Sequence, residues 1–125
     1  MSKLSHGTNM VEQYLYRYLD AEKKIELDPE GYLVNHKQWD ERVARLLADT
    51  EGVELSAEHW EIISVVRDFY ARYEMAPAMR PLVKAVQQAL GDEKGRSVYL
   101  MMLFPGSPAK RIARLAGLPK PTNCL

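Results

Sequence analysis

A chain of 125 residues with 46% hydrophobic and 27% charged residues has the size and composition of one folded domain, not of a disordered segment. Its 17 basic and 17 acidic side chains cancel to a formal net charge of zero, which disfavours autonomous nucleic-acid binding. One cysteine cannot close an internal disulfide, and with three scattered histidines it does not match the spacing of a zinc site. We therefore expect no metal or other cofactor and a reducing, cytoplasmic compartment.

The N-terminal third predicts a short helix followed by a hairpin. Apolar residues recur at three- and four-residue spacing from Val11 to Leu19, as in an amphipathic helix. Ile25 and Leu27 then precede a turn at residues 28–31, in which proline fits the second position and glycine the fourth. We expect the return strand at residues 32–34.

Five further helices are predicted, each bounded by a cap or a breaker. The expected N-terminal signals are Asn35, Ser56, Pro81 in the first turn of the third helix, Asp92, and Ser107 followed by Pro108. The expected ends are Gly52, Glu74, Gly91, Phe104 and, after a last helix over residues 108–116, Gly117. No apolar run approaches the roughly 20 residues of a membrane span, and no signal-peptide core is present, so no membrane association is expected.

These elements predict a mostly helical α+β fold, in which a small N-terminal β-hairpin or meander packs on a bundle of about five helices. Residues 1–22 are expected to be an extension, either a short helix or a disordered leader. Residues 23–117 form the predicted domain, and residues 118–125 form a flexible, proline-containing arm.

The predicted arm carries the only cysteine. Gly117 is its expected hinge and Leu118 its first residue, while Pro119 and Pro121 favour an extended, polyproline-like chain. At about 3.1 Å per residue, the steps from Gly117 to Cys124 could carry the thiol roughly 20 Å from the domain. A lone cysteine is usually a buried, inert residue, but a position next to the carboxyl terminus favours an accessible, reactive thiol.

Four basic side chains precede or flank this thiol: Lys110, Arg111, Arg114 and Lys120. They could favour the thiolate, whereas the neighbouring terminal carboxylate opposes it. The same residues are more simply explained as the solvated face of a short helix, and both explanations remain open.

The last thirteen residues, Ala113-Arg-Leu-Ala-Gly-Leu-Pro-Lys-Pro-Thr-Asn-Cys-Leu125, resemble the C-terminal signature of the DsrC/TusE family of sulfur-relay proteins. Upstream segments are also similar to the family pattern: Asp28-Pro-Glu-Gly-Tyr-Leu-Val34, Trp39, Glu58-His-Trp60, Arg67-Asp-Phe-Tyr70 and Ala76-Pro-Ala-Met-Arg80. The resemblance implies that Cys124 carries sulfur as a persulfide. The two-cysteine branch has a second cysteine where this chain has Ala113, so the resemblance is closest to the single-cysteine TusE type.

By resemblance, the chain would accept sulfur from a TusBCD-type donor complex and pass it to an MnmA-type tRNA thiouridylase for wobble-uridine 2-thiolation. This is a sulfurtransferase in the carrier sense, because no general base or metal ligand near the arm indicates independent catalysis. Two alternatives remain open: a single-cysteine relay in another pathway such as sulfur oxidation, and a regulatory DNA-binding helical module. The electrostatics argue against the second, since the best-formed helix carries Glu58, Glu61 and Asp68 against Arg67 and Arg72.

Overall fold

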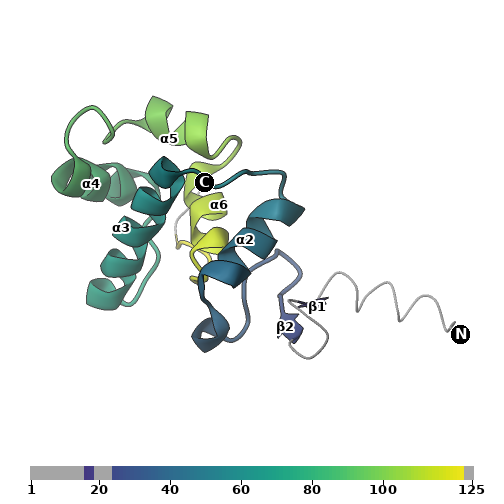
Figure 1. The fold of residues 1–125 in the computed structure, drawn as a ribbon. Coiled ribbons are helices and arrows are strands. Elements are labelled where there is room, and N and C mark those ends of the chain that lie inside the picture. The colour runs from purple at the N-terminus through teal and green to yellow at the C-terminus, as the bar shows by residue number, and fades with distance from the viewer. Residues whose placement is uncertain (1–15, 19–23, 123–125) are drawn as a thin grey trace, which may run out of the picture.

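The computed structural model describes residues 16–18, for which only the backbone is given, and residues 24–122. Figure 1 shows a two-stranded sheet at one end and a group of helices beside it. In chain order the elements are β1 (Tyr16–Tyr18), β2 (Lys24–Glu26), the 3-10 helix η1 (His36–Gln38), α2 (Glu41–Thr50), α3 (Ala57–Tyr73), α4 (Met79–Leu90), α5 (Ser97–Leu103) and α6 (Pro108–Leu115). The predicted fold class, a small β unit on about five helices, is confirmed.

The N-terminal β unit is a short meander. Strands β1 and β2 pair antiparallel, with Arg17 opposite Ile25, and an isolated bridge joins Leu27 to Leu33. Ile25 is fully buried between two exposed neighbours, the alternation expected of a strand with one covered face. The predicted helix over residues 11–19 is wrong for Tyr16–Tyr18, where pairing with β2 overrides the helical spacing. The rest of that segment lies outside the described residues.

The turn at residues 28–31 has the geometry expected from its sequence. The amide of Gly31 donates to the carbonyl of Asp28 over 2.9 Å, and Gly31 has a φ of 92°, which only glycine adopts without strain. The Asp28 carboxylate also accepts hydrogen bonds from the amides of Glu30 and Tyr32. This turn packs against α6, because a Cβ on Gly31 would lie 3.2 Å from Arg114 Cδ.

The predicted helix from Asn35 is divided in two. The Asn35 side chain caps only η1, Trp39 then adopts an extended conformation, and Asp40 caps α2 by accepting a hydrogen bond from the Val43 amide over 2.9 Å. The break has a tertiary cause: the indole of Trp39 donates to the carbonyl of Leu115 in α6, which a continuous helix would not place it to do. The predicted end of α2 before Gly52 is confirmed.

Helices α3 and α4 agree with their sequence signals. Ser56 caps α3 and forms a capping box with His59, whose Nε2 also lies 2.8 Å from the carbonyl of Leu103. Because this imidazole is 8% exposed and fully used, His59 is a structural residue. Pro81 is in the first turn of α4, and Gly91 ends that helix with a φ of 100°.

Asp92 does not cap α5, which begins five residues later at Ser97. Between the two helices the chain folds back on α4, and a Cβ on Gly95 would lie 2.4 Å from the Cβ of Gln87. A helix through this segment would place side chains where α4 already lies, so close packing delays the helix start.

Helix α6 is at the centre of the bundle, in contact with α2, α3 and α4. Its buried residues, including Ile112, Ala113 and Leu115, share one core with Ile25, Leu47 and Phe104. No helix within residues 16–18 and 24–122 is long and apolar enough to cross a membrane. The C-terminal tail, residues 118–125, therefore starts from the most enclosed helix of the fold.

Candidate functional site: the base of the C-terminal tail

The end of α6 is a Schellman motif, which sets the direction in which the tail leaves the helix. The amide of Leu118 donates to the carbonyl of Ala113 over 2.9 Å, and the amide of Gly117 donates to that of Arg114 over 3.1 Å. Gly117 has a φ of 73°, the left-handed conformation that this motif requires. The predicted helix end at Gly117 is thus confirmed, although Ala116 is the cap and not the last helical residue.

The next carbonyls along the chain accept hydrogen bonds from three side chains of distant elements. Trp39 Nε1 donates to the carbonyl of Leu115 over 2.8 Å, Arg67 Nη1 to that of Ala116 over 2.7 Å, and His36 Nδ1 to that of Gly117 over 2.8 Å. A carbonyl oxygen only accepts, so His36 carries a proton on Nδ1. We call these three side chains the clamp and residues 115–118 the tail base.

Trp39 also fills the space beside the tail base. A Cβ on Gly117 would lie 2.3 Å from Trp39 Cδ1, far inside van der Waals contact. The Arg67 guanidinium stacks over the Trp39 ring with its Cζ 3.8 Å from the ring centroid. Arg67, Trp39 and Gly117 therefore form one packed layer that holds the backbone at the start of the tail.

The first residues of the tail lie against the body instead of extending from it. Leu118 is 2% exposed and belongs to the core, and Pro121 is buried, while Pro119 is half-buried. Lys120 forms an exposed ion pair of 2.9 Å with Glu30 in the turn of the meander. Residues 118–121 therefore do not stand out from the body as an extended arm, because their apolar surface is more favourably buried than solvated. The mobility expected of residues 118–125, with Gly117 as hinge, stays a prediction.

The four basic residues expected to support the thiolate have different surroundings. Glu51, at the end of α2, accepts hydrogen bonds from Arg111 Nε over 2.9 Å and from Arg114 Nε over 2.8 Å. The hydrogen bond that Arg114 donates to Glu51 raises the pKa of Arg114 above its ordinary value. Lys120 is paired with Glu30, and Lys110 is half-buried. The charges of Arg111, Arg114 and Lys120 are thus neutralised by carboxylates of the body. Cys124 itself lies outside the described residues.

Comparisons with known proteins identify the family of this chain. Residues 20–125 match the family model described as DsrC like protein. The chain belongs to the DsrC-like family. It is 52% identical over 103 residues to the sulfurtransferase TusE of Escherichia coli K12, covering 82% of this chain and 94% of that protein. A TusE homolog of Haemophilus influenzae is also 52% identical, over 102 residues.

The solved structures of DsrC proteins share the fold. The solution structure of Allochromatium vinosum DsrC superposes with a TM-score of 0.78 at 47% identity, covering 88% of this chain and 99% of that one. The oxidized γ-subunit of dissimilatory sulfite reductase from Archaeoglobus fulgidus superposes with a TM-score of 0.72 at 44% identity, covering 82% and 94%. Within this DsrC-like fold, no group of three His, Cys, Asp or Glu side chains among the described residues is placed to hold a metal ion.

Sequence reasoning missed the clamp and Glu51. Trp39 and Arg67 stand in segments that resemble the family pattern, but nothing local indicates that their side chains bind the backbone at the end of α6. Nothing local shows that Glu51 contacts Arg111 in α6, or that His36 contacts Gly117 just after it. These partners follow 60 and 81 residues later along the chain. Only the long-range packing of this DsrC-like chain brings them together.

The Glu51 carboxylate should be important for stability. We expect Glu51→Gln to lower the free energy of unfolding by about 1 to 3 kcal/mol, since it leaves two guanidinium groups without their counter-charge at 19% and 23% side-chain exposure. Glu30→Gln is the matched control, because its ion pair with Lys120 is 58% and 45% exposed, and it should cost less than about 0.5 kcal/mol. Urea unfolding measures both. Equal losses of stability in Glu51→Gln and Glu30→Gln would contradict this account of the Glu51 ion pairs.

Proposed function

We propose that this chain is a sulfur-relay carrier that holds sulfane sulfur as a persulfide on Cys124. The observation that carries the proposal is the position of the chain's only cysteine, next to the carboxyl terminus and just beyond a tail base tied to the body by the clamp. The DsrC-like family and the relatives called sulfurtransferases support it. The body then serves to present one thiol and not to catalyse a reaction of its own.

The proposed step is an exchange in which atoms and electrons balance. The Cys124 thiolate attacks the outer sulfur of a donor persulfide, so a new S–S bond forms on Cys124 while the donor's S–S bond breaks. The donor leaves as a thiolate with the bonding electron pair, and the proton stays on the transferred sulfur. In the second exchange the acceptor thiolate attacks that outer sulfur and Cys124 leaves. No external oxidant is required.

The packed tail limits how far the thiol can reach. Leu118 and Pro121 are buried, and Pro121 is the last buried residue in the part of the chain that the structure describes. From Pro121 to Cys124 the chain advances by three residues, which span at most about 10 to 11 Å. This is about half the reach expected for an arm free from Gly117. A partner must therefore approach the tail base closely, or displace residues 118–121 from the body.

The partner should also supply part of the thiolate stabilisation. Arg111 and Arg114 are paired with Glu51, and Lys120 with Glu30, so the body offers little unneutralised positive charge from these residues. A receiving pocket with cationic groups or backbone amides would lower the pKa of the thiol on docking. Reactivity would then be highest in the complex, where transfer is useful.

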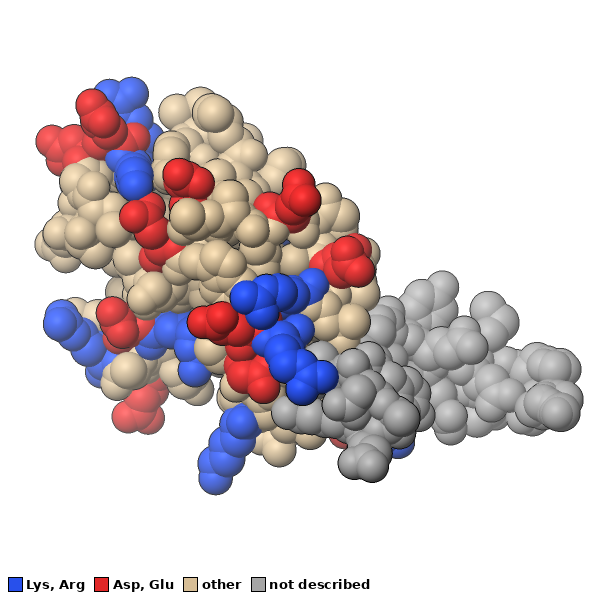
Figure 2. Space-filling view, viewed as in Figure 1, with Lys and Arg blue, Asp and Glu red and all other residues tan. Residues whose placement is uncertain are grey.

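For the pathway, we propose a TusBCD-type donor and an MnmA-type tRNA thiouridylase as acceptor, in the cytoplasm, with residues 1–22 as an extension outside the relay domain. Figure 2 shows acidic and basic side chains interspersed on the face in view, which does not favour nucleic-acid binding there. RNA would accordingly be met through the acceptor protein.

Intact-protein mass spectrometry tests the proposal. After incubation with a persulfide donor, the full chain should gain about 32 Da, one sulfur atom, and lose it on treatment with a thiol reductant. No gain would reject the carrier function. Loaded protein mixed with the MnmA-type enzyme and unmodified tRNA should then yield 2-thiouridine. Loading without thiolation would instead favour a relay in another sulfur pathway.

A further inference from the structure

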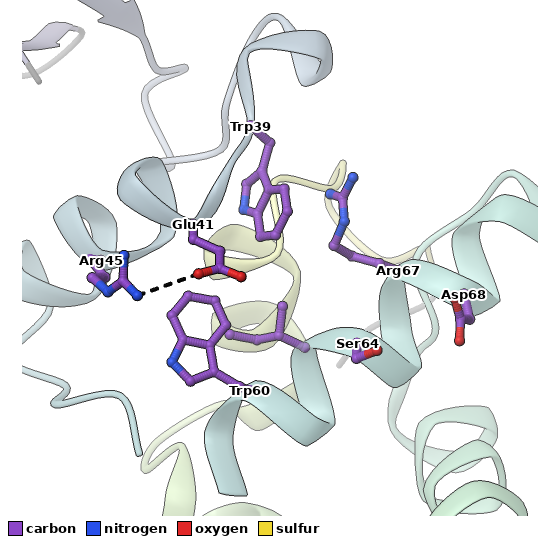
Figure 3. A pocket seen from close by; sticks show the side chains of 8 residues that line it. Trp39, Glu41, Arg45, Trp60, Ser64, Arg67 and Asp68 are labelled. Carbon is purple, nitrogen blue, oxygen red and sulfur yellow. Dashed lines mark hydrogen bonds and ion pairs between the residues drawn. The ribbon is translucent and has the colours of Figure 1, made fainter. Parts of the chain in front are cut away.

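A groove of about 510 Å³ lies between α2 and α3, beside the clamp. Figure 3 shows Trp39 on one side and Trp60 on the other, both half-buried, and the buried Ile63 also lines it. Arg67 projects next to Trp39, and Ser64 lies on the exposed rim. Both tryptophans of the chain line this one groove. Its lining combines the residue types that dominate protein–protein interfaces, tryptophan and arginine.

The Arg67 guanidinium lines the groove without an ion-pair partner in the part of the chain that the structure describes. It donates one hydrogen bond to the Ala116 carbonyl, and no carboxylate of the described residues lies within ion-pair distance of it. Desolvation lowers the pKa of Arg67 from its ordinary value. The guanidinium has five N–H donors, so most of its donors remain for a ligand.

The other charged residues of the groove do not neutralise the charge of Arg67. Glu41 is paired with Arg45 over 3.4 Å, and the Arg45 guanidinium lies 5.3 Å from the Trp60 ring centroid. Asp68 is exposed, and Figure 3 shows it at the margin of the groove, directed away from the Arg67 guanidinium. A carboxylate entering beside Trp39 would meet a cation without a partner charge.

The groove is continuous with the tail base. Trp39 and Arg67 line it, and the same two side chains hold the carbonyls of Leu115 and Ala116. A partner that exchanges sulfur with Cys124 must come close to the tail base, because so little chain follows Pro121. Such a partner therefore needs a contact surface in this region of the body.

We propose that this groove receives an acidic side chain with an apolar neighbour, carried on a surface loop of the protein that exchanges sulfur with Cys124. The carboxylate binds the free edge of Arg67, and the apolar neighbour fits between Trp39 and Trp60. The inference rests on the proposed sulfur-relay function and adds a docking surface to it. A partner seated here lies against the side chains that orient the tail.

Charge substitutions at Ser64 test the sign of the partner group while every clamp side chain is kept. Ser64 is exposed on α3, so Ser64→Glu and Ser64→Lys should both fold. Ser64→Glu adds a carboxylate that repels an acidic loop and competes for Arg67, and it should weaken partner binding by about tenfold or more. Ser64→Lys should bind as well as wild type or better. The matched control, Gln88→Glu, adds the same charge in the separate groove between α3 and α4.

Binding of the purified TusBCD-type complex and of the MnmA-type thiouridylase is measured for each variant. Fluorine NMR of the 5-fluorotryptophan-labelled chain then shows whether the partner contacts the groove. Its two resonances both come from the groove, and at least one partner should shift them in wild type and in Gln88→Glu but not in Ser64→Glu. Unchanged binding of both partners by Ser64→Glu, or equal weakening by Gln88→Glu, overturns the proposal. The proposal is also overturned if the tryptophan resonances of the chain alone shift when Leu125 is deleted, because the groove then holds the tail. It is likewise overturned if they shift on dilution, because the groove then holds a second copy of the chain.

The same variants separate this inference from the proposed function. Loading of Cys124 by a small-molecule persulfide needs no protein contact, so Ser64→Glu should load like wild type. Failure of wild type to load would reject the carrier function. Normal loading together with unaltered transfer between Ser64→Glu and the partners would reject the docking groove alone.

Discussion

Cys124→Ala should abolish persulfide loading completely and leave the folded body intact. The chain has no other cysteine, so this substitution removes every thiol that could accept sulfane sulfur. Position 124 comes three residues after Pro121, the last buried residue among residues 24–122, and we expect no measurable change in thermal stability. Intact mass after incubation with a persulfide donor, compared with the melting curve of the same sample, checks both parts. A sulfur atom retained by the variant would show that loading does not occur on this thiol.

Moving the thiol distinguishes its chemistry from its reach. In the Cys124→Ala background, Thr122→Cys places a thiol two residues nearer the body at an exposed position. We expect this variant to load from a small-molecule persulfide but to transfer poorly to the protein acceptor, because two residues shorten the tail by about 7 Å. Transfer at the wild-type rate would mean that reach beyond Pro121 is not limiting.

Gly117→Ala should be among the most destabilising substitutions of a small side chain in this protein. The left-handed φ of 73° costs a non-glycine residue about 1 to 2 kcal/mol. The added methyl would also lie 2.3 Å from Trp39 Cδ1, and such overpacking typically costs a further 1 to 3 kcal/mol or so. We expect a total loss of about 2 to 5 kcal/mol in the free energy of unfolding, a large part of the stability of a typical domain.

Gly52→Ala is the matched control for that substitution. Gly52 ends α2 in the same Schellman geometry, with the Val53 amide bonded to the Ala48 carbonyl and a φ of 72°, but nothing lies within 4 Å of its potential Cβ. Gly52→Ala should therefore lower the free energy of unfolding only through the strained left-handed φ, by about 1 to 2 kcal/mol. Chemical unfolding of both variants isolates the contact with Trp39. Equal losses would mean that Trp39 moves aside without cost and that the layer with Arg67 is not rigid.

The clamp connects these predictions to the docking inference. Gly117→Ala displaces Trp39, and Trp39 lines the groove as well as donating to the Leu115 carbonyl. Damage at the tail base should consequently appear as altered binding in the groove as well as lower stability. The residues that orient the tail and the residues offered to a partner are in part the same.

Much of the fold follows from local sequence chemistry. The cap at Ser56, the glycines at positions 91 and 117, and the turn at residues 28–31 each encode a hydrogen-bond pattern or a φ value that few other residues satisfy. The apolar spacing of α3 then selects the face that is buried. The position of the cysteine, next to the carboxyl terminus, favours a carrier because chain ends are usually accessible.

Long-range packing decided what local signals could not. Trp39 leaves the helical conformation because α6 offers it a carbonyl, and Asp92 does not begin a helix because α4 lies against Gly95. Residues 118–121 have the composition of a solvated arm since their prolines exclude regular structure, yet burial of Leu118 and Pro121 holds them on the body.

The order of residues along the chain is enough to specify the helical class, the helix boundaries with strong caps, and the identity of the residue proposed to carry sulfur. Packing in three dimensions was needed to establish that Leu118 and Pro121 are buried, which cations are already neutralised by Glu51, and that His36, Trp39 and Arg67 meet at the tail base. The physical reason is the separation along the chain over which each kind of interaction acts. Caps and turns act over a few residues, whereas burial, ion pairing and carbonyl satisfaction join residues that only the packed chain brings within contact.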